Sequence, residues 1–224
     1  MNQIFSVACL LFFLFISGAA CSQNNEIKIR FIGNCGLYLT DGKDHVYIDF
    51  PYKSGAHNYM EYNLSELDSV KMNPVFIYTH KHGDHYSGKL VKRLANKLDG
   101  HVYGPWNVDE LSELDKRLQN FTIEPLQSKH RFSFNHYSYL ITWHQKHIFI
   151  SGDTEHPETI ASIAHIDWAF VPAWLISYAY EQNIKLSGIE NIVVYHIGPR
   201  DKITTSNPKI KLLNTQGEII TVAY

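Results

Sequence analysis

The stretch Thr79-His80-Lys81-His82-Gly83-Asp84-His85 places four metal-binding side chains within six positions. The run before it, Pro74-Val75-Phe76-Ile77-Tyr78-Thr79, is short, apolar and rich in β-branched and aromatic residues, which is typical of a buried strand. From Gly88 onward, leucines recur four residues apart, which predicts an amphipathic helix that ends near Gly100. The sequence therefore predicts a strand, a loop of candidate ligands and a helix, in that order.

This residue combination indicates a metal site. Neutral imidazole nitrogens and a carboxylate oxygen suit borderline divalent metals such as zinc, and a loop at the carboxyl end of a strand gathers ligands without distorting the sheet. The alternative is a surface histidine cluster without function, and the strand, loop and helix context argues against it. One loop cannot complete such a site alone, so further ligands must come from elsewhere in the chain.

Three distant positions can supply those ligands. The strand-like run at residues 149–151 leads into Gly152-Asp153-Thr154, and the apolar run at residues 193–195 ends in His196. Between them, His130 is predicted in a polar loop before a strand at residues 138–143, which pairs through a turn with residues 147–151. His136 is the alternative to His130, but it begins an alternating run that would commit its ring to one face of a sheet.

Seven side chains are therefore candidate metal ligands. They are His80, His82, Asp84, His85, His130, Asp153 and His196.

The order of these motifs resembles the signature of the metallo-β-lactamase superfamily, over roughly residues 27 to 200. The resemblance implies an α/β fold, a four-layer αββα sandwich. It also implies two metal positions, with His80, His82 and His130 at the first, Asp84, His85 and His196 at the second, and Asp153 bridging them. The Gly-Asp-Thr and His196-Ile197-Gly198 segments look most like the branch of ascorbate-phosphate lactonases and N-acyl phosphatidylethanolamine phospholipases D.

The same resemblance implies the chemistry. Two divalent metal ions, zinc first with manganese or iron as alternatives, would activate a hydroxide that attacks the substrate. Asp84 would be catalytic, because it would orient this hydroxide and pass its proton to the leaving group. The expected reaction is hydrolysis of an ester, lactone, amide or phosphodiester.

Asp49 follows the predicted strand Val46-Tyr47-Ile48 and has two equally weighted interpretations. In the first, it orients a ligand histidine, as an early strand-end aspartate does in the family that the chain resembles. In the second, it is an ordinary carboxylate in a turn.

The first residues indicate export. Residues 7–16 are almost wholly apolar, and Gly18-Ala19-Ala20-Cys21 resembles a bacterial lipoprotein signal. We therefore predict a signal peptide at residues 1–20, a lipidated Cys21 that anchors the protein to a membrane of the cell envelope, a tether at 21–26, and one hydrolase domain at 27–224. Ordinary signal cleavage after Ala20 is the alternative. Cys35 is then without a disulfide partner and is interpreted as a small buried apolar residue.

Composition narrows the range of partners. A formal net charge of −2, with lysines and arginines scattered, disfavours a nucleic-acid substrate, so we expect a small-molecule or lipid-like one. Aromatic residues at 52–62 and 174–180 would either wall the pocket or, as we favour, pack between loop and sheet.

Two other functions fit the ligand set. One is a non-catalytic metal-binding lipoprotein of the envelope. The other is a di-iron oxygen or nitric oxide reductase, although neither a flavin domain nor a ferredoxin-like cysteine set is recognisable in the sequence.

The remaining elements are predicted by pattern alone. Residues 27–32, 37–40 and 45–50 alternate and are separated by turn residues, which predicts an antiparallel meander. Asn107 and Glu110 resemble a capping box for a helix that reaches Arg117, and Pro157 is predicted to start a short helix.

Overall fold

The computed structural model describes residues 25–224. The predicted signal peptide at 1–20, the predicted lipid anchor Cys21 and most of the predicted tether lie outside the described residues. Within residues 25–224, no helix combines the length and the apolar character needed to cross a bilayer.

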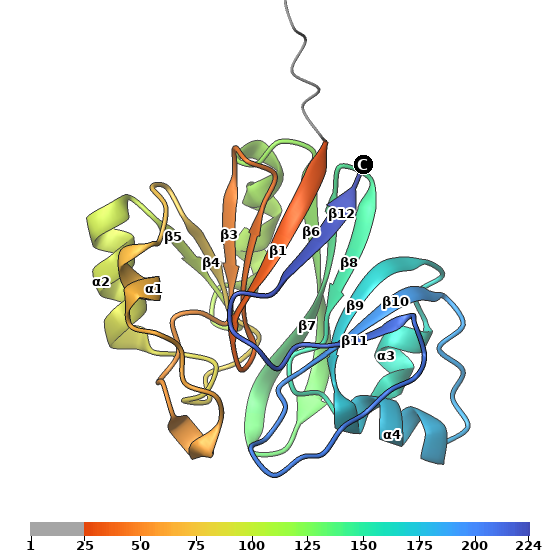
Figure 1. Ribbon diagram of the computed structural model, residues 1–224. Helices are drawn as coiled ribbons and strands as arrows, with labels where there is room; N and C mark the ends of the chain where they lie inside the picture. The colour runs from red at the N-terminus through yellow and green to blue at the C-terminus, as the bar shows by residue number, and fades with distance from the viewer. Residues whose placement is uncertain (1–24) are drawn as a thin grey trace, which may run out of the picture.

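Two six-stranded sheets form the centre of the protein (Figure 1). The first sheet, in spatial order, consists of β12 (Ile219–Ala223), β1 (Glu26–Gly33), β2 (Gly36–Thr40), β3 (His45–Ile48), β4 (Val75–Ile77) and β5 (His101–Tyr103). The second consists of β11 (Ile210–Leu212), β10 (Ile189–Tyr195), β9 (Ile166–Pro172), β8 (Lys146–Ile150), β7 (Ser133–Trp143) and β6 (Phe121–His130).

Helices flank the two sheets. The α-helices are α1 (Ser65–Asp68), α2 (Gly88–Leu98), α3 (Pro157–Ala161) and α4 (Ala173–Glu181), and the 3-10 helices are η1 (Ala56–Asn58) and η2 (Val108–Lys116). In Figure 1, α1 and α2 lie outside the first sheet, and α3 and α4 lie beside β9, β10 and β11 of the second.

Three buried apolar clusters correspond to the three interfaces of a four-layer sandwich. The largest joins the two sheets, and in it Leu37 and Ile48 belong to the same cluster as Trp143. A second cluster joins Phe76 of β4 to Leu94 of α2, and a third joins Phe149 of β8 to Ile160 of α3. Burial of these faces drives the layers together, because apolar surface removed from water is the main stabilising contribution to folding.

The predicted meander is confirmed, as are α2 and the start of α3. Strands β1, β2 and β3 pair antiparallel, with Ile29 opposite Leu39 and Leu37 opposite Ile48. The predicted hairpin at residues 138–151 is also present, because β7 and β8 pair antiparallel around a turn in which His144 and Gln145 have positive φ.

Two local predictions were wrong. His130 does not lie in a loop: it is the last residue of β6, which pairs with β7 over nearly its whole length. The segment after Asn107 is a 3-10 helix, and Asn107 makes no side-chain bond to its first N–H groups. Instead, the Asn107 amide accepts a hydrogen bond from the Gly104 N–H and donates one to the Glu110 carboxylate.

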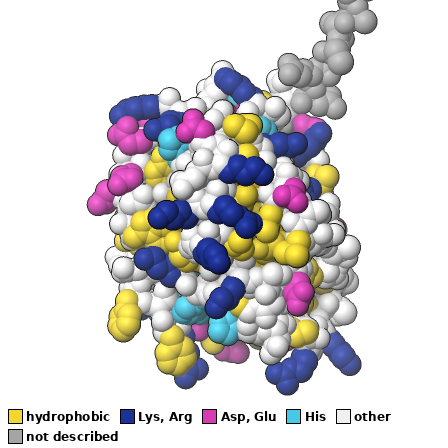
Figure 2. All heavy atoms as spheres, turned by 90° about the vertical axis from the view of Figure 1, so that its left-hand side faces the viewer, with side chains coloured by type: hydrophobic (Ala, Val, Ile, Leu, Met, Phe, Trp, Pro, Cys, Tyr) yellow, Lys and Arg dark blue, Asp and Glu magenta, His cyan; other side chains and the backbone are white. Residues whose placement is uncertain are grey.

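The outer face of α2 is basic. Lys89, Lys92, Arg93 and Lys97 are exposed there, whereas Val91 and Leu94 are buried beneath. Figure 2 views this side of the molecule and shows lysine and arginine side chains across its middle. The cations are thus more closely grouped on this face than the expectation of scattered charges implied.

Strand directions bring the candidate ligands to one end of the sandwich. Strand β4 runs parallel to β3, and β8, β9 and β10 run parallel to one another, so their carboxyl ends share an edge in each sheet. Strand β6 is antiparallel to β7, which is antiparallel to β8, so β6 ends at the same edge as β8. The residues that follow these strands therefore lie close together.

Candidate metal centre

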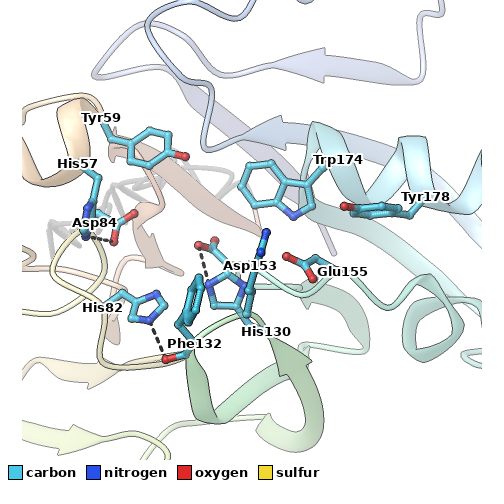
Figure 3. Close-up of a pocket in the computed structure, with 11 residues that line it drawn as sticks. His57, Tyr59, His82, Asp84, His130, Phe132, Asp153, Glu155, Trp174 and Tyr178 are labelled. Carbon is cyan, nitrogen blue, oxygen red and sulfur yellow. Dashed lines mark hydrogen bonds and ion pairs between the residues drawn. The ribbon is translucent and has the colours of Figure 1, made fainter.

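All seven predicted ligands converge at this end of the molecule. The loop between β4 and α2 supplies four of them, and the ends of β6, β8 and β10 supply the other three. Figure 3 shows His82, Asp84, His130 and Asp153 from these separate elements around one opening. The structure thus brings together every residue that the sequence motifs singled out, and their roles as ligands remain a prediction.

Three histidines form a first group. Ring nitrogens of His80, His82 and His130 all lie within 4.8 Å of one another, the spacing of side chains that share a metal. His80 is buried, while His82 and His130 are partly exposed. His82 Nε2 lies 3.3 Å from the carbonyl oxygen of Phe132 in the β6–β7 turn (Figure 3).

A second, more deeply buried group surrounds Asp153. Its Oδ2 atom lies 3.1 Å from His85 Nε2 and 3.2 Å from His196 Nε2. The same oxygen lies 3.9 Å from His80 Nε2 and 3.8 Å from His130 Nε2 of the first group. Asp153 therefore lies between the two groups, in the bridging place that the family resemblance implied for it.

Asp84 approaches the second group from another side. Its Oδ2 atom lies 3.3 Å from His196 Nε2 and 3.8 Å from His85 Nε2, and its Oδ1 atom lies 3.9 Å from His57 Nε2 on the exposed rim. Asp84 thus connects the buried centre with the opening (Figure 3).

Asp49 orients a candidate ligand, which resolves its two interpretations. Its Oδ2 atom lies 2.8 Å from His85 Nδ1, and the Thr79 N–H and hydroxyl both donate hydrogen bonds to the carboxylate. All three residues are fully buried. With Nδ1–H donated to Asp49, His85 turns Nε2 toward Asp153, and Nε2 is then the nitrogen that the ring can offer to a metal.

His136 supports the centre from behind. It is fully buried on β7, and its Nε2 atom accepts a hydrogen bond from the Asp153 N–H at 2.9 Å. Its Nδ1 atom lies 2.8 Å from the Ser128 hydroxyl. Both ring nitrogens are therefore engaged, so the ring fixes the Asp153 backbone, whereas His130 lies among the ligand candidates.

Comparisons with known proteins bear on this arrangement. Neither a family model nor a curated protein matches the sequence. Among solved structures, Igni18, a metallo hydrolase of the archaeon Ignicoccus hospitalis, is similar with a TM-score of 0.62 at 17% identity, over 89% of this chain and 99% of that one. The metallo-β-lactamase fold protein YhfI of Bacillus subtilis is similar with a TM-score of 0.59 at 14% identity, over 88% and 100%. The chain has the metallo-β-lactamase fold.

This metallo-β-lactamase fold is shared by proteins with different chemistries. CmlA, a diiron β-hydroxylase of Streptomyces venezuelae, is similar with a TM-score of 0.55 at 12% identity, over 89% of this chain and 54% of that one. The predicted αββα sandwich is confirmed, and the finer placement among lactonases and phospholipases stays a prediction. Similarity at such low identity establishes the fold alone.

Charge in this metallo-β-lactamase fold is concentrated at the second group. Burial alone would lower the pKa values of His85 and His196, but the groups around them, the Asp153 carboxylate first, together raise both pKa values well above the usual value. In return, these histidines hold the pKa of Asp153 far below its usual range, although burial opposes this. A metal cation would take over the role of the protons on these rings.

The surrounding histidines have lowered pKa values instead. Burial, with a contribution from nearby His85, lowers the pKa of His80 well below its usual value. Burial also lowers the pKa of His130, and that of His136 to about 3. These rings are neutral at physiological pH, and neutral imidazole is the form that binds metals.

The residues present fit a divalent metal. His80 Nε2, both ring nitrogens of His196 and Asp153 Oδ1 are buried without a hydrogen-bond partner. Buried polar atoms without partners are costly, so several such atoms on neighbouring residues indicate a ligand for them. Imidazole and carboxylate donors are suited to zinc and to other borderline divalent metals.

The sequence interpretation missed one contact of Cys35. Cys35 is fully buried, as expected, but its Sγ atom lies 3.7 Å from His85 Nε2. The neighbouring Asn34 accepts a hydrogen bond from the His196 N–H and donates one to the Asp84 carbonyl oxygen. The β1–β2 turn is thus part of the centre, although its sequence carries no recognisable ligand motif.

The centre opens into a cavity of about 580 Å³. Its lining consists of His57, Tyr59, His82, Asp84, His130, Arg131, Phe132, Asp153, Glu155, Trp174 and Tyr178. Figure 3 shows Tyr59 and Trp174 above the centre on opposite sides, and both rings meet His196 edge-on. Of the aromatic residues weighed from the sequence, these two and Tyr178 wall the pocket, whereas Tyr52 and Tyr62 pack in the core.

Proposed function

We propose that this protein is a metal-dependent hydrolase that acts on an ester, lactone, amide or phosphodiester bond. The observation that carries the proposal is the convergence of seven candidate ligands, several with unpartnered buried donor atoms, at the floor of an open cavity. The fold supports it, because neighbours with the same fold are named metallo hydrolases.

Two divalent metals fit the donors. His80, His82 and His130 would hold one, Asp84, His85 and His196 the other, and Asp153 would contact both. When bound, such metals lower the pKa of water toward neutrality and polarise the bond to be cleaved. Zinc suits this donor set best, and manganese and iron are alternatives.

Asp84 is the residue placed to handle the proton. Burial would raise its pKa, but the adjacent His196 imidazole, together with His85, holds the pKa below its usual value, so the carboxylate is ionised. An ionised carboxylate accepts a hydrogen bond from attacking water and aligns it. Asp84 also lines the open cavity beside exposed His57, whose Nε2 lies 3.9 Å from Asp84 Oδ1, so water in the cavity can reach the carboxylate.

The cavity walls favour a substrate with an apolar or ring-shaped portion. Tyr59, Trp174 and Tyr178 line one part of the cavity, and Phe132 lines another. Arg131 adds a positive charge beside them, with its guanidinium 5.3 Å from the centre of the Phe132 ring. Aromatic walls with a few polar groups are typical of small-molecule sites, so we propose a small-molecule or lipid-like substrate.

The test is a hydrolase screen coupled to metal analysis. The protein should contain up to two divalent metals per chain, lose turnover of chromogenic esters, lactones or phosphodiesters after chelation, and regain it with zinc. A metal-loaded protein without turnover in any of these classes would instead favour the non-catalytic metal-binding alternative.

A di-iron oxygen enzyme is the second candidate, favoured by the similarity to CmlA, a diiron β-hydroxylase. The two functions differ in metal and in chemistry. Iron as the bound metal, together with oxygen consumption in the presence of a reductant, would identify the second function.

We also propose that the protein is a lipoprotein of the bacterial envelope, anchored through Cys21. The support is the small-residue run that ends at Cys21 after an apolar segment. In a bacterial host the protein should incorporate labelled fatty acid, and Cys21→Ser should prevent it while Cys35→Ser should not. A soluble, unlabelled wild-type protein would contradict the anchor.

A further inference from the structure

The β1–β2 turn presents a thiol to the second group of ligands. Cys35 is fully buried, and Asn34 before it is held by hydrogen bonds to the His196 N–H and the Asp84 carbonyl oxygen. The turn is therefore fixed relative to two segments that carry candidate ligands. Such anchoring orients the thiol toward the centre rather than leaving it to the general packing of the core.

Four donor atoms meet at this place. Cys35 Sγ, a nitrogen of His85, an oxygen of Asp153 and a nitrogen of His196 all lie within 4.8 Å of one another, and all four residues are buried. His196 is 2% exposed, and its Nε2 atom has no hydrogen-bond partner although it lies close to Asp153. An unpartnered buried imidazole beside the thiol is a separate indication that a ligand binds here.

The donor separations are close to those between neighbouring donors of a zinc site. Zinc binds nitrogen at about 2.0–2.1 Å and sulfur at about 2.3 Å, so neighbouring tetrahedral donors lie about 3.4–3.6 Å apart. The separation from Cys35 Sγ to His85 Nε2 is 3.7 Å, and Asp153 Oδ2 lies 3.1 Å from His85 Nε2 and 3.2 Å from His196 Nε2. Shifts of a few tenths of an ångström would bring these donors to coordination spacing.

A purely apolar role for Cys35 leaves this geometry unexplained. The side chain also packs in the cluster between the two sheets, as a small core residue would. However, Asp49 engages His85 Nδ1, so the sulfur faces His85 Nε2, the nitrogen left to bind a metal. Sulfur opposite an imidazole lone pair, beside a second imidazole without a partner, is the arrangement of a mixed thiolate and imidazole metal site.

We propose that the Cys35 thiolate is a further ligand of the second metal position, beside Asp84, His85, His196 and Asp153. The inference rests on the proposed metal-dependent function and adds a donor that the seven-residue motif lacks. Binding replaces the S–H bond with a sulfur–metal bond, and the proton is released to solvent. The first group then has only neutral imidazoles beside the shared Asp153, whereas the second gains an anionic, soft donor that favours zinc over manganese.

Cobalt and zinc probes test the proposal on the full-length protein without any turnover assay. Cobalt bound to a thiolate should give a sulfur-to-metal charge-transfer band in the near ultraviolet, and X-ray absorption of the zinc form should show a sulfur neighbour at about 2.3 Å. Both signals should be lost in Cys35→Ser, with the cobalt or zinc content falling toward one metal per chain.

A Cys9→Ser/Cys21→Ser double variant is the matched control, because Cys9, Cys21 and Cys35 are the three cysteines of the sequence. It should keep the sulfur signals, and it decides the question even if Cys35→Ser fails to fold. Metal bound without a sulfur signal, or a signal that persists in Cys35→Ser, overturns the role of Cys35 and leaves the hydrolase proposal standing. A protein that binds neither cobalt nor zinc contradicts both.

Discussion

The two groups of candidate ligands differ in how they are held. In the first group, the His82 ring is hydrogen-bonded to a backbone carbonyl in the β6–β7 turn, and His130 Nδ1 is buried without a partner. In the second, Asp49 and Thr79 brace His85, and His136 binds the backbone of Asp153. The centre therefore combines an open, adaptable half that faces the cavity with a rigid, charged half behind it.

This difference shows which group of ligands needs fixed side-chain positions. The second group concentrates its charge at 0–5% exposure, where an unpaired carboxylate would be costly, so each partner is fixed. The first group contains no carboxylate of its own, and burial lowers the pKa values of His80 and His130, so small movements of His82 and His130 cost little. Such movement suits the half of a metal centre that receives a substrate.

Asp153 belongs to both halves, so its loss should have the largest effect. Asp153→Asn removes the charge that lies between the two groups and leaves the shape almost unchanged. We expect loss of both metals and at least about a 100-fold fall in turnover, since even outer partners of metal ligands are worth 10–100-fold. Metal analysis and initial rates measure this. Asp115→Asn, at an exposed position on η2, is the matched control, and a metal-replete Asp153→Asn protein would refute the central position of Asp153.

His82→Ala should impair metal binding only at the first group of ligands. We expect hydrolysis to be abolished and one of two metals to be lost, with the melting temperature unchanged under metal-free conditions, because His82 contributes little to the core. His101→Ala is the control, since His101 begins β5 at the end of its sheet opposite the centre. Undiminished activity in His82→Ala would contradict the metallohydrolase interpretation.

Substitutions of His130 and His136 should distinguish a metal ligand from a residue that only holds the Asp153 backbone in place. His130→Ala should lose metal or most of the activity. His136→Ala should keep its metal but unfold more easily by about 1–3 kcal/mol, because the Asp153 N–H and the Ser128 hydroxyl lose a buried partner. Metal content and thermal unfolding separate the two outcomes, and the reverse pattern would transfer the ligand role to His136.

Asp49→Asn should weaken metal binding at the second group of ligands and leave the first group unaffected. The asparagine amide would donate to His85 Nδ1 and force the proton onto Nε2, the nitrogen that faces Asp153. We expect about 10–100-fold weaker binding of the second metal, with the first unchanged. Titration with cobalt, followed by absorbance, resolves the two steps, and equal weakening of both steps would contradict a selective role.

The smallest effect is expected at Asp41 and His144, a carboxylate and imidazole pair away from the metal centre. Asp41 Oδ2 lies 2.9 Å from His144 Nε2, and the Lys43 and Asp44 N–H groups donate to the other carboxylate oxygen. Burial would raise the pKa of Asp41, but these bonds lower it below the unfolded value. The stabilisation is thus present above the unfolded pKa, about 3.9, and is lost as the pH falls through the lowered folded value.

Asp41→Asn should lower the free energy of unfolding by about 1 kcal/mol at neutral pH without changing metal content. Urea unfolding at pH 7 and pH 3 checks this, and a cost that grows at low pH would contradict it.

The sequence predicted the motif-bearing parts of the centre because their signals are local. The run from Pro74 to His85 contains its own strand and loop pattern, and Asp153 and His196 each follow an apolar run. Strand β6 was missed because Pro125 and several polar residues interrupt its pattern. The strand tolerates Pro125 because β6 is the edge of its sheet, where a missing N–H breaks no ladder on the open side.

Contacts between distant segments could not be predicted from local patterns. The approach of Cys35 to His85 joins residues 50 positions apart, across the turn of one strand pair and the end of another. Nothing in Asn34-Cys35-Gly36 resembles a ligand spacing. The role of Asp49 remained open for the same reason, because its partner His85 is 36 positions away.

The pairing of β1 with β12 has a consequence for folding during synthesis. Glu26 pairs with Ala223, so one edge of β1 stays unpaired until residues 219–223 have been made. Contacts across such separations form slowly, and an open strand edge is a template for pairing with other chains. Misassembly of newly made chains should therefore begin at β1, and a variant that weakens β12 should aggregate while its metal-binding residues remain intact.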